Sequence, residues 1–559
     1  MNDYYDLGDH HCPVTTTSRE AQLWFDRGLV WTYGFNHQEA VACFARALEH
    51  DPDCAMAQWD VAYATGPNYN MPWEIFDAAS RAEALATTHA ATQKALALAH
   101  RVTPEEAALI RALSARYPQA TPVADMAAWD RDFADAMRAV CAAHPGHLDL
   151  RSVFVESLLN LTPWQMWDLS TGQPAEGAAT LEVQAALEYA FATDPEAMRH
   201  PGLLHLYVHL MEMSPHPEKA LQQADVLRTL VPDAGHLVHM PTHIDVLCGQ
   251  YHDVVHWNER AVAADLKYFA REGAFNLYTG YRQHNYHFVI YGALFLGQIE
   301  PALRANRGLW ETTPEAMLRI ESPPMADYFE SFMAMEPHIL VRFGCWEEAK
   351  ALDVPEDPDL YRTLTASVHY ARAIAHAATG DVAAAEAEET LFLSAVAQVP
   401  ETRLMHNNRV VDLLAIAREM LRGEILYRKG AFDAAFAHLR RLVELDDNLP
   451  YDEPWGWMQP TRHALGALLF EQGRVDEAEA VYRADLGLGG DLPRAMVHPD
   501  NVWALKGLHD CLQLRGAEGE LAWLRPRLDL ALARADGAVA ASCFCAQAAM
   551  RAASAPAAD

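Results

Sequence analysis

The segment AQLWFDRGLVWTYGFNHQEAVACFARALEHDPDCAMAQW (residues 21–59) decides the fold. Aromatic and small residues recur in it at intervals of three and four: Trp24, Gly28 and Trp31 in the first half, then Ala40, Phe44 and Ala47 in the second. Residues spaced in this way share one face of an α-helix. The segment therefore predicts two helices that pack closely through small residues flanked by aromatic ones. Pro52 follows, and it cannot continue the second helix.

The same spacing returns in GEILYRKGAFDAAFAHLRRLVELDD (423–447) and ALGALLFEQGRVDEAEAVYRADL (464–486), and weaker copies turn at Gly249, Gly297 and Gly344. The pattern resembles that of long tetratricopeptide repeat (TPR) proteins of the bacterial type, which are built from helix–turn–helix units of about 34 residues. Strand signals are nearly absent. We predict an all-α, TPR-like α-solenoid, in which stacked helix pairs form a superhelix with a concave groove.

Four stretches rich in Pro and Trp interrupt the repeats: 66–76, 158–174, 321–332 and 449–464. Such loops either cover and shape the groove or pack on the convex side, and the sequence does not decide between the two. The expected organisation is an N-terminal tail (1–17), N-terminal repeats (18–175), central His-rich repeats (176–350), C-terminal repeats (351–545) and a disordered Ala-rich tail (546–559).

Composition limits the classes of partner and the cellular compartment that we expect. The chain has 559 residues and a formal net charge of −33, which argues against nucleic acid and anionic membrane as partners. No long apolar run and no basic-then-apolar leader is present, so we expect a cytoplasmic protein, either a monomer or a homodimer. The nine cysteines are scattered. Cys543 and Cys545 form a C-x-C pair that we interpret as two semi-buried thiols, with a soft-metal or redox role as the alternative.

Histidines gather between residues 199 and 288, in a chain that contains 27 of them. We align two units on their turn glycines and a third on Ala220, the small residue that opens its second helix. The family's groove-facing positions of the first helix then place one carboxylate and seven imidazoles on the groove: Glu212, with His205, His209, His236, His239, His243, His284 and His287. Several of these histidines are three or four residues apart, as in helical metal chelates. Pro241 interrupts this register, because a regular helix can begin near it but not run through it.

Neutral imidazoles offer lone pairs to divalent ions. We predict that the seven histidines bind one or two ions per chain (zinc, iron, manganese or copper), with Glu212 as ligand or catalytic general base. The predicted function is a metal-dependent enzyme, hydrolytic or oxidative, acting on a small molecule. The alternative is a non-enzymatic scaffold that binds a peptide or protein in the groove.

Other residues are weaker candidates. His37 lies at the first inter-helix turn, where we expect a structural role. The sequence HHC at 10–12 has metal-binding residue types but lies in the expected tail. Turn chemistry explains Asn68, Tyr69 and Asn70 as well as substrate binding does. Glu156 and His338 stand at comparable helix positions in flanking repeats and are outside candidates for the same groove. The residues without a clear place are His406, Asn407, Asn408 and His463.

Overall fold

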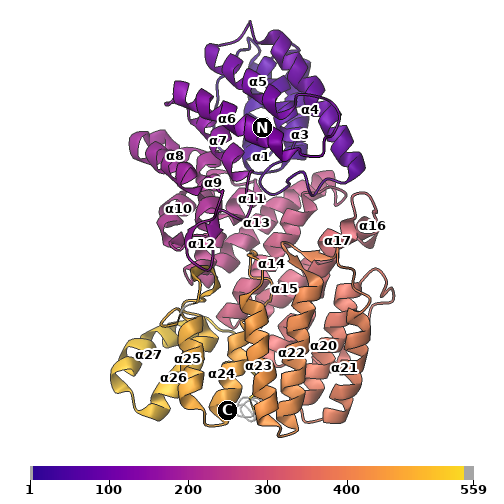
Figure 1. Ribbon diagram of the computed structural model, residues 1–559, viewed down its shortest axis with the longest axis vertical. Helices are drawn as coiled ribbons and strands as arrows, with labels where there is room; N and C mark the ends of the chain where they lie inside the picture. Colours follow the sequence, from indigo (N-terminus) through magenta and orange to yellow (C-terminus); the bar gives the residue numbers. More distant parts are fainter. Residues whose placement is uncertain (1–3, 491, 547–559) are drawn as a thin grey trace. The chain divides into compact units, whose positions relative to one another are not determined.

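The computed structural model describes residues 4–490 and 492–546, and these are helical over most of their length (Figure 1). The chain divides into two compact units. Unit 1 comprises residues 1–244 and 260–271, and unit 2 comprises residues 245–259 and 272–559. The division falls within the central His-rich segment and passes through α12 (Pro241–Leu247) and α13 (Tyr251–Glu272).

Unit 1 is a series of helical hairpins in which each helix packs on the next, from α1 to α7, and α9 packs on both α7 and α1. Its helices are α1 (Arg19–Tyr33), α2 (His37–His50), α3 (Ala55–Thr65), α4 (Ala78–Leu98), α5 (Pro104–Arg116), α6 (Ala127–Ala143), α7 (Leu148–Leu159), α8 (Thr180–Thr193), η1 (Pro195–Arg199), α9 (Pro201–Met211), η2 (Pro217–Ala220), α10 (Leu221–Leu230) and α11 (Gly235–His239). One antiparallel hairpin joins β1 (Trp167–Asp168) to β2 (Gln173–Pro174).

Unit 2 ends in an array of helices running from α20 to α27, which Figure 1 shows standing next to one another. Its helices are α14 (Thr279–Leu296), α15 (Ile299–Thr312), α16 (Glu315–Leu318), α17 (Met325–Phe329), η3 (Glu330–Ala334), α18 (Met335–Phe343), α19 (Trp346–Ala351), α20 (Arg362–Ala378), α21 (Val382–Val396), α22 (Val410–Arg428), α23 (Phe432–Asp447), α24 (Thr461–Glu471), α25 (Val475–Asp485), η4 (Arg494–Met496), α26 (Val502–Arg515) and α27 (Glu518–Leu532). The hairpin of β3 (Leu404–Met405) and β4 (Asn408–Arg409) precedes α22.

Neighbouring helices contact each other at the small residues that the sequence predicts there. A Cβ atom on Gly28 would lie 2.5 Å from the ring of Phe44, so α1 and α2 approach through this glycine. A Cβ atom on Gly466 would lie 2.6 Å from the ring of Tyr482, which gives the same contact between α24 and α25. Gly297 ends α14 with a left-handed backbone (φ 72°), which only glycine adopts without strain. The architecture is the predicted TPR-like α-solenoid.

The N-terminal segment is not a free tail. Tyr4 donates a hydrogen bond from its hydroxyl to Glu39 Oε1 (2.6 Å), and the side chains of Leu7 and Cys12 are buried. The residues from 4 onward are therefore packed on unit 1. The segment contains aromatic and apolar residues, and unit 1 buries them.

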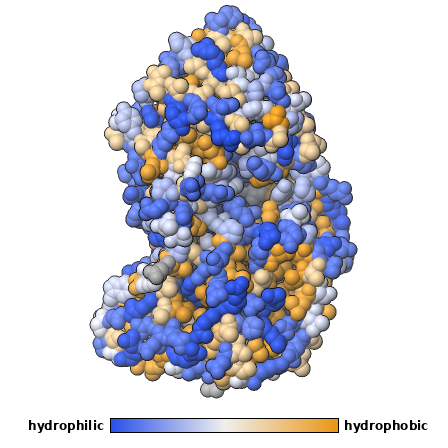
Figure 2. Space-filling view, viewed as in Figure 1, coloured by the Kyte–Doolittle hydropathy of each residue, from blue (hydrophilic) through white to orange (hydrophobic). Residues whose placement is uncertain are grey.

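The other end of the described chain contains the C-x-C pair. Cys543 and Cys545 are joined by a disulfide, so they are not the two thiols that we expected. The predicted Ala-rich tail from 547 onward lies outside the described residues. Among residues 4–490 and 492–546, no helix is long and apolar enough to cross a membrane. Figure 2 shows hydrophilic side chains over much of the visible surface.

Candidate metal sites

Five of the seven predicted histidines gather in unit 1. His205 and His209 lie on α9, His236 and His239 on α11, and His243 on α12. Pro241 is the first residue of α12, which confirms that the helix is interrupted there. Each of these five side chains is at most 2% exposed, so they form a buried cluster and do not line an open surface groove.

Three of these imidazoles lie close enough together for one metal ion to reach all of them. One ring nitrogen from each of His205, His209 and His236 lies within 4.8 Å of the others. Nδ1 of His205 lies 2.6 Å from the carbonyl oxygen of Tyr33. Because a carbonyl only accepts, Nδ1 carries the proton and Nε2 carries the lone pair. Metal-binding histidines are usually held in this way by a hydrogen bond from the second nitrogen.

Glu212 holds His209 in the same tautomer. Its Oε1 accepts from Nδ1 of His209 (2.9 Å), and its Oε2 lies 2.7 Å from Nδ1 of His243. Nε2 of His243 is 2.7 Å from Nε2 of His239. The carboxylate, which is 0% exposed, thus connects His209 to a second pair of imidazoles. This position suits a residue that orients His209 and anchors a proton path.

Aromatic rings enclose the triad. The ring of Phe35 lies 4.6 Å from that of His205, 5.8 Å from that of His209 and 5.6 Å from that of His236, measured between centroids. Burial, together with the charges of the neighbouring imidazoles, holds the pKa of His236 well below its ordinary value of 6.5. His236 is therefore neutral near pH 7 and can offer a lone pair.

A cavity of about 540 Å³ lies in unit 1, and two of the interrupting loops line it. Its lining includes Pro67, Asn68, Trp73, Asn160, Pro163 and Trp164. The hydroxyl of Tyr69 accepts a hydrogen bond from the backbone N–H of Trp164 (3.0 Å), and the ring of Tyr69 lies 4.5 Å from that of His209. One tyrosine thus contacts both the cavity wall and the histidine cluster. In unit 1, loops 66–76 and 158–174 thus border the same cavity.

The other two predicted histidines lie in unit 2, on α14, where a third joins them. His284 Nδ1 is 2.6 Å from Nε2 of His406, and one nitrogen from each of His284, His287 and His406 lies within 4.8 Å of the others. His406 occupies the turn between β3 and β4, with φ 47°. Helical periodicity missed it because a turn residue follows no period. The MHNN sequence was the one available signal.

Two further candidates have ordinary roles. His463 contacts Asp485 through Nε2 (2.9 Å), and Glu156 accepts from the hydroxyl of Tyr63 (2.7 Å). Burial raises the pKa of Glu156, which makes it a hydrogen-bonded core carboxyl.

The N-terminal histidine also belongs to a hydrogen-bond network. Oδ1 of Asp149 lies 2.9 Å from Nε2 of His10 and 3.2 Å from Nε2 of His200, and it accepts from the hydroxyl of Tyr33 (2.8 Å). Nδ1 of His200 accepts from the backbone N–H of Leu203 (3.2 Å) and so carries no proton. The ring proton is then on Nε2 and points at Asp149. We interpret this cluster as a staple for the N-terminal segment, although its residue types could bind a metal.

No protein-family model matches the chain, and no curated protein matches its sequence. Its helix pairs, with small residues at their contacts and glycine at their turns, settle the architecture. It is a TPR-like helical repeat protein. Solved structures that are similar to this TPR-like chain include a chain of the APC/C hetero-tetramer Cut9–Hcn1 (12% identity, TM-score 0.27, 96% of each chain covered). Others are a chain of Naa15/Naa10 bound to HypK-THB (12%, 0.22, covering 95% of this chain and 74% of that one) and yeast Tom70 (13%, 0.25, covering 92% and 98%).

Proposed function

We propose that unit 1 binds a metal ion through His205, His209 and His236 and acts on a small molecule beside it. The observation that carries the proposal is the convergence of three buried imidazole nitrogens, two of them fixed in the ligand tautomer by Tyr33 and Glu212. Three imidazoles with no thiolate suit a site that keeps a position open for water or substrate.

The nitrogen ligands restrict the set of metals that suit the site but do not select one of them. Zinc, iron, manganese and copper all accept imidazole, whereas calcium and magnesium prefer oxygen. A bound ion would supply activation of water or of dioxygen. Glu212 would hold His209 in place, and the ring of Phe35 would exclude bulk water. Glu212 and the pair His239 and His243 would take up or pass on a proton.

The cavity beside Tyr69 supports a small molecule as the substrate. At about 540 Å³ it falls in the range of small-molecule sites. Trp73 and Trp164 supply apolar surface, and Asn68 and Asn160 supply polar contacts. A peptide scaffold remains the alternative function of a TPR-like fold. The five unit-1 histidines are at most 2% exposed, however, and a peptide lying on the surface would not reach them.

X-ray absorption of the zinc- or iron-loaded protein tests the site. We expect scattering from about three imidazoles and none from sulfur in the wild type. His236→Ala should lose this signal, while His216→Ala, which changes an exposed histidine, should keep it. An unchanged spectrum in His236→Ala would reject the ligand assignment.

The proposal that a small molecule binds in the cavity needs a separate test. A ligand panel can be screened by thermal shift against metal-loaded wild type, Ala127→Trp and Ala124→Trp. Ala127 lines the cavity and is exposed, so tryptophan there should fill the cavity without disturbing the core. Ala124 is exposed and does not line it. Ligands that stabilise the wild type and Ala124→Trp but not Ala127→Trp would support the proposal. Equal stabilisation of all three would contradict it.

A further inference from the structure

A thioether contacts the histidines of unit 2, and none of these residues belongs to the unit-1 triad. Nε2 of His287 lies 2.8 Å from the sulfur of Met458, and both side chains are at most 1% exposed. The two atoms are in direct contact, and imidazole nitrogen and thioether sulfur are both ligand types for copper. Nδ1 of His287 has no hydrogen-bond partner among the described residues.

The contact between His284 and His406 is equally close. Their nitrogens are 2.6 Å apart, so one proton lies between them. A metal ion bound by both imidazoles would take the place of that proton. The hairpin of β3 and β4 presents His406 to α14, and residues 449–464 present Met458 to the same helix. Two segments that interrupt the repeats thus bring ligand types to a pair of helical histidines.

The donor set identifies the ion. Thioether sulfur is a soft ligand that suits copper(I), and imidazole binds copper as well, whereas manganese and magnesium prefer carboxylate, carbonyl and water oxygens. We infer that unit 2 binds one copper(I) ion through His284, His287, His406 and the sulfur of Met458. The inference is independent of the proposed function, because it uses none of the unit-1 ligands.

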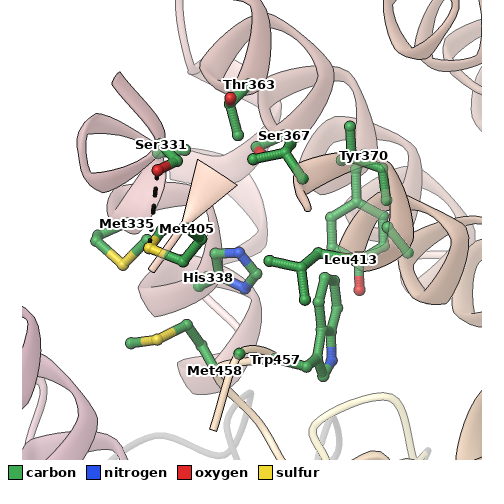
Figure 3. A pocket seen from close by; sticks show the side chains of 15 residues that line it. Ser331, Met335, His338, Thr363, Ser367, Tyr370, Met405, Leu413, Trp457 and Met458 are labelled. Carbon is green, nitrogen blue, oxygen red and sulfur yellow. Dashed lines mark hydrogen bonds between the residues drawn. The ribbon is translucent and has the colours of Figure 1, made fainter. Parts of the chain in front are cut away.

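More sulfur lies directly beside Met458. A cavity of about 30 Å³, which is large enough to hold a water molecule, is lined by Met458 together with Met335, Met405 and His338. Figure 3 shows the three methionine side chains on one side of this cavity, with the imidazole of His338 next to them. These side chains provide copper(I) with either a route of sulfur ligands to the site or additional ligands at it.

Competition with bicinchoninate under anaerobic conditions measures the copper(I) affinity. Met458→Leu keeps the volume of the side chain and should weaken binding at least tenfold. Met333→Leu, which changes a fully buried methionine of η3, should not. Copper X-ray absorption should show a sulfur shell in the wild type and in Met333→Leu that is lost in Met458→Leu. His287→Gln should weaken copper(I) binding as well.

Three results would overturn the inference. The first is a wild-type protein that binds no copper(I). The second is Met458→Leu with unchanged affinity and an unchanged sulfur shell. The third is loss of the copper in His205→Ala/His209→Ala, which would assign the ion to unit 1. Failure of the unit-1 proposal alone would leave the sulfur shell and its dependence on Met458 in place. Circular dichroism of each variant shows whether the fold is retained.

Discussion

Tyr33 and His205 are joined by a hydrogen bond in which the imidazole Nδ1 lies 2.6 Å from the tyrosine carbonyl oxygen. Tyr33 is the last residue of α1, where carbonyl groups have no partner within the helix. The end of the first repeat thus sets the tautomer of a histidine on α9. The hydroxyl of the same tyrosine donates to Asp149 (2.8 Å), so one residue supports both the histidine cluster and the N-terminal staple.

Glu212→Gln should weaken metal binding without abolishing it. Glutamine keeps the size of the side chain but removes the charge that fixes the tautomer of His209. Loss of such a supporting contact costs about 10- to 100-fold in metal affinity. Isothermal titration with zinc measures the effect. Glu218→Gln, which alters an exposed His–Glu pair, is the control and should leave the affinity unchanged. Full wild-type affinity in Glu212→Gln would contradict the role given to Glu212.

Asp149→Asn should loosen the N-terminal segment. The carboxylate oxygen contacts Tyr33, His10 and His200, and an amide cannot replace all three contacts. Since Asp149 is partly exposed, we expect a loss of about 1–2 kcal/mol in the free energy of unfolding. Residues 4–17 should also exchange amide hydrogen faster. Asp53→Asn, in an exposed ion pair with Arg101, should cost less than about 0.5 kcal/mol. Unchanged exchange in Asp149→Asn would argue against the staple.

Gly28→Ala should destabilise the first helix pair. The added methyl group would lie 2.5 Å from the ring of Phe44, and overpacking of this kind costs about 1–3 kcal/mol. In Gly519→Ala the new methyl group would meet nothing within 4 Å, so helix propensity should make that variant as stable as the wild type or more so. Urea denaturation of both variants makes the comparison. Equal stabilities would show that α1 and α2 do not depend on this close approach.

Acid should destabilise the protein through His37. Burial lowers the pKa of His37 to about 4, while an unfolded histidine titrates near ~6.5. The unfolded state therefore binds more protons between these values, and the stabilising contribution falls as the pH drops below about 6.5. Between pH 7.5 and pH 5 the wild type should lose up to about 2 kcal/mol more than His37→Gln. The exposed His100→Gln should follow the wild type. Parallel pH profiles for all three proteins would refute the prediction.

The repeat architecture was predictable because helix contacts repeat locally. Gly28, Phe44 and the turn glycines stand at fixed intervals, and these intervals reflect how adjacent helices touch. The same periodicity found His205 and His209 on one face of α9. The local sequence pattern alone was therefore sufficient to predict the repeats and to place these two histidines on one helix face.

Periodicity could not find residues that reach a site from turns. Phe35 and His406 have left-handed backbone conformations, with φ 54° and 47°, and Met458 lies in a loop with no helical register. Their places depend on contacts between segments far apart in the chain. Burial also could not be read from the register. The family's groove positions suggested an accessible surface, whereas Phe35 and Tyr69 cover His209.

Elemental analysis of the untagged protein, purified without chelator, tests the central claim most directly. The wild type should carry one ion that His205→Ala/His209→Ala lacks, a difference of one equivalent per chain. The control His252→Ala/His256→Ala removes an exposed histidine pair with the same spacing, on α13, and should keep the full complement. An equal metal content in all three proteins, or a wild type that binds no divalent ion even on titration, would contradict the account.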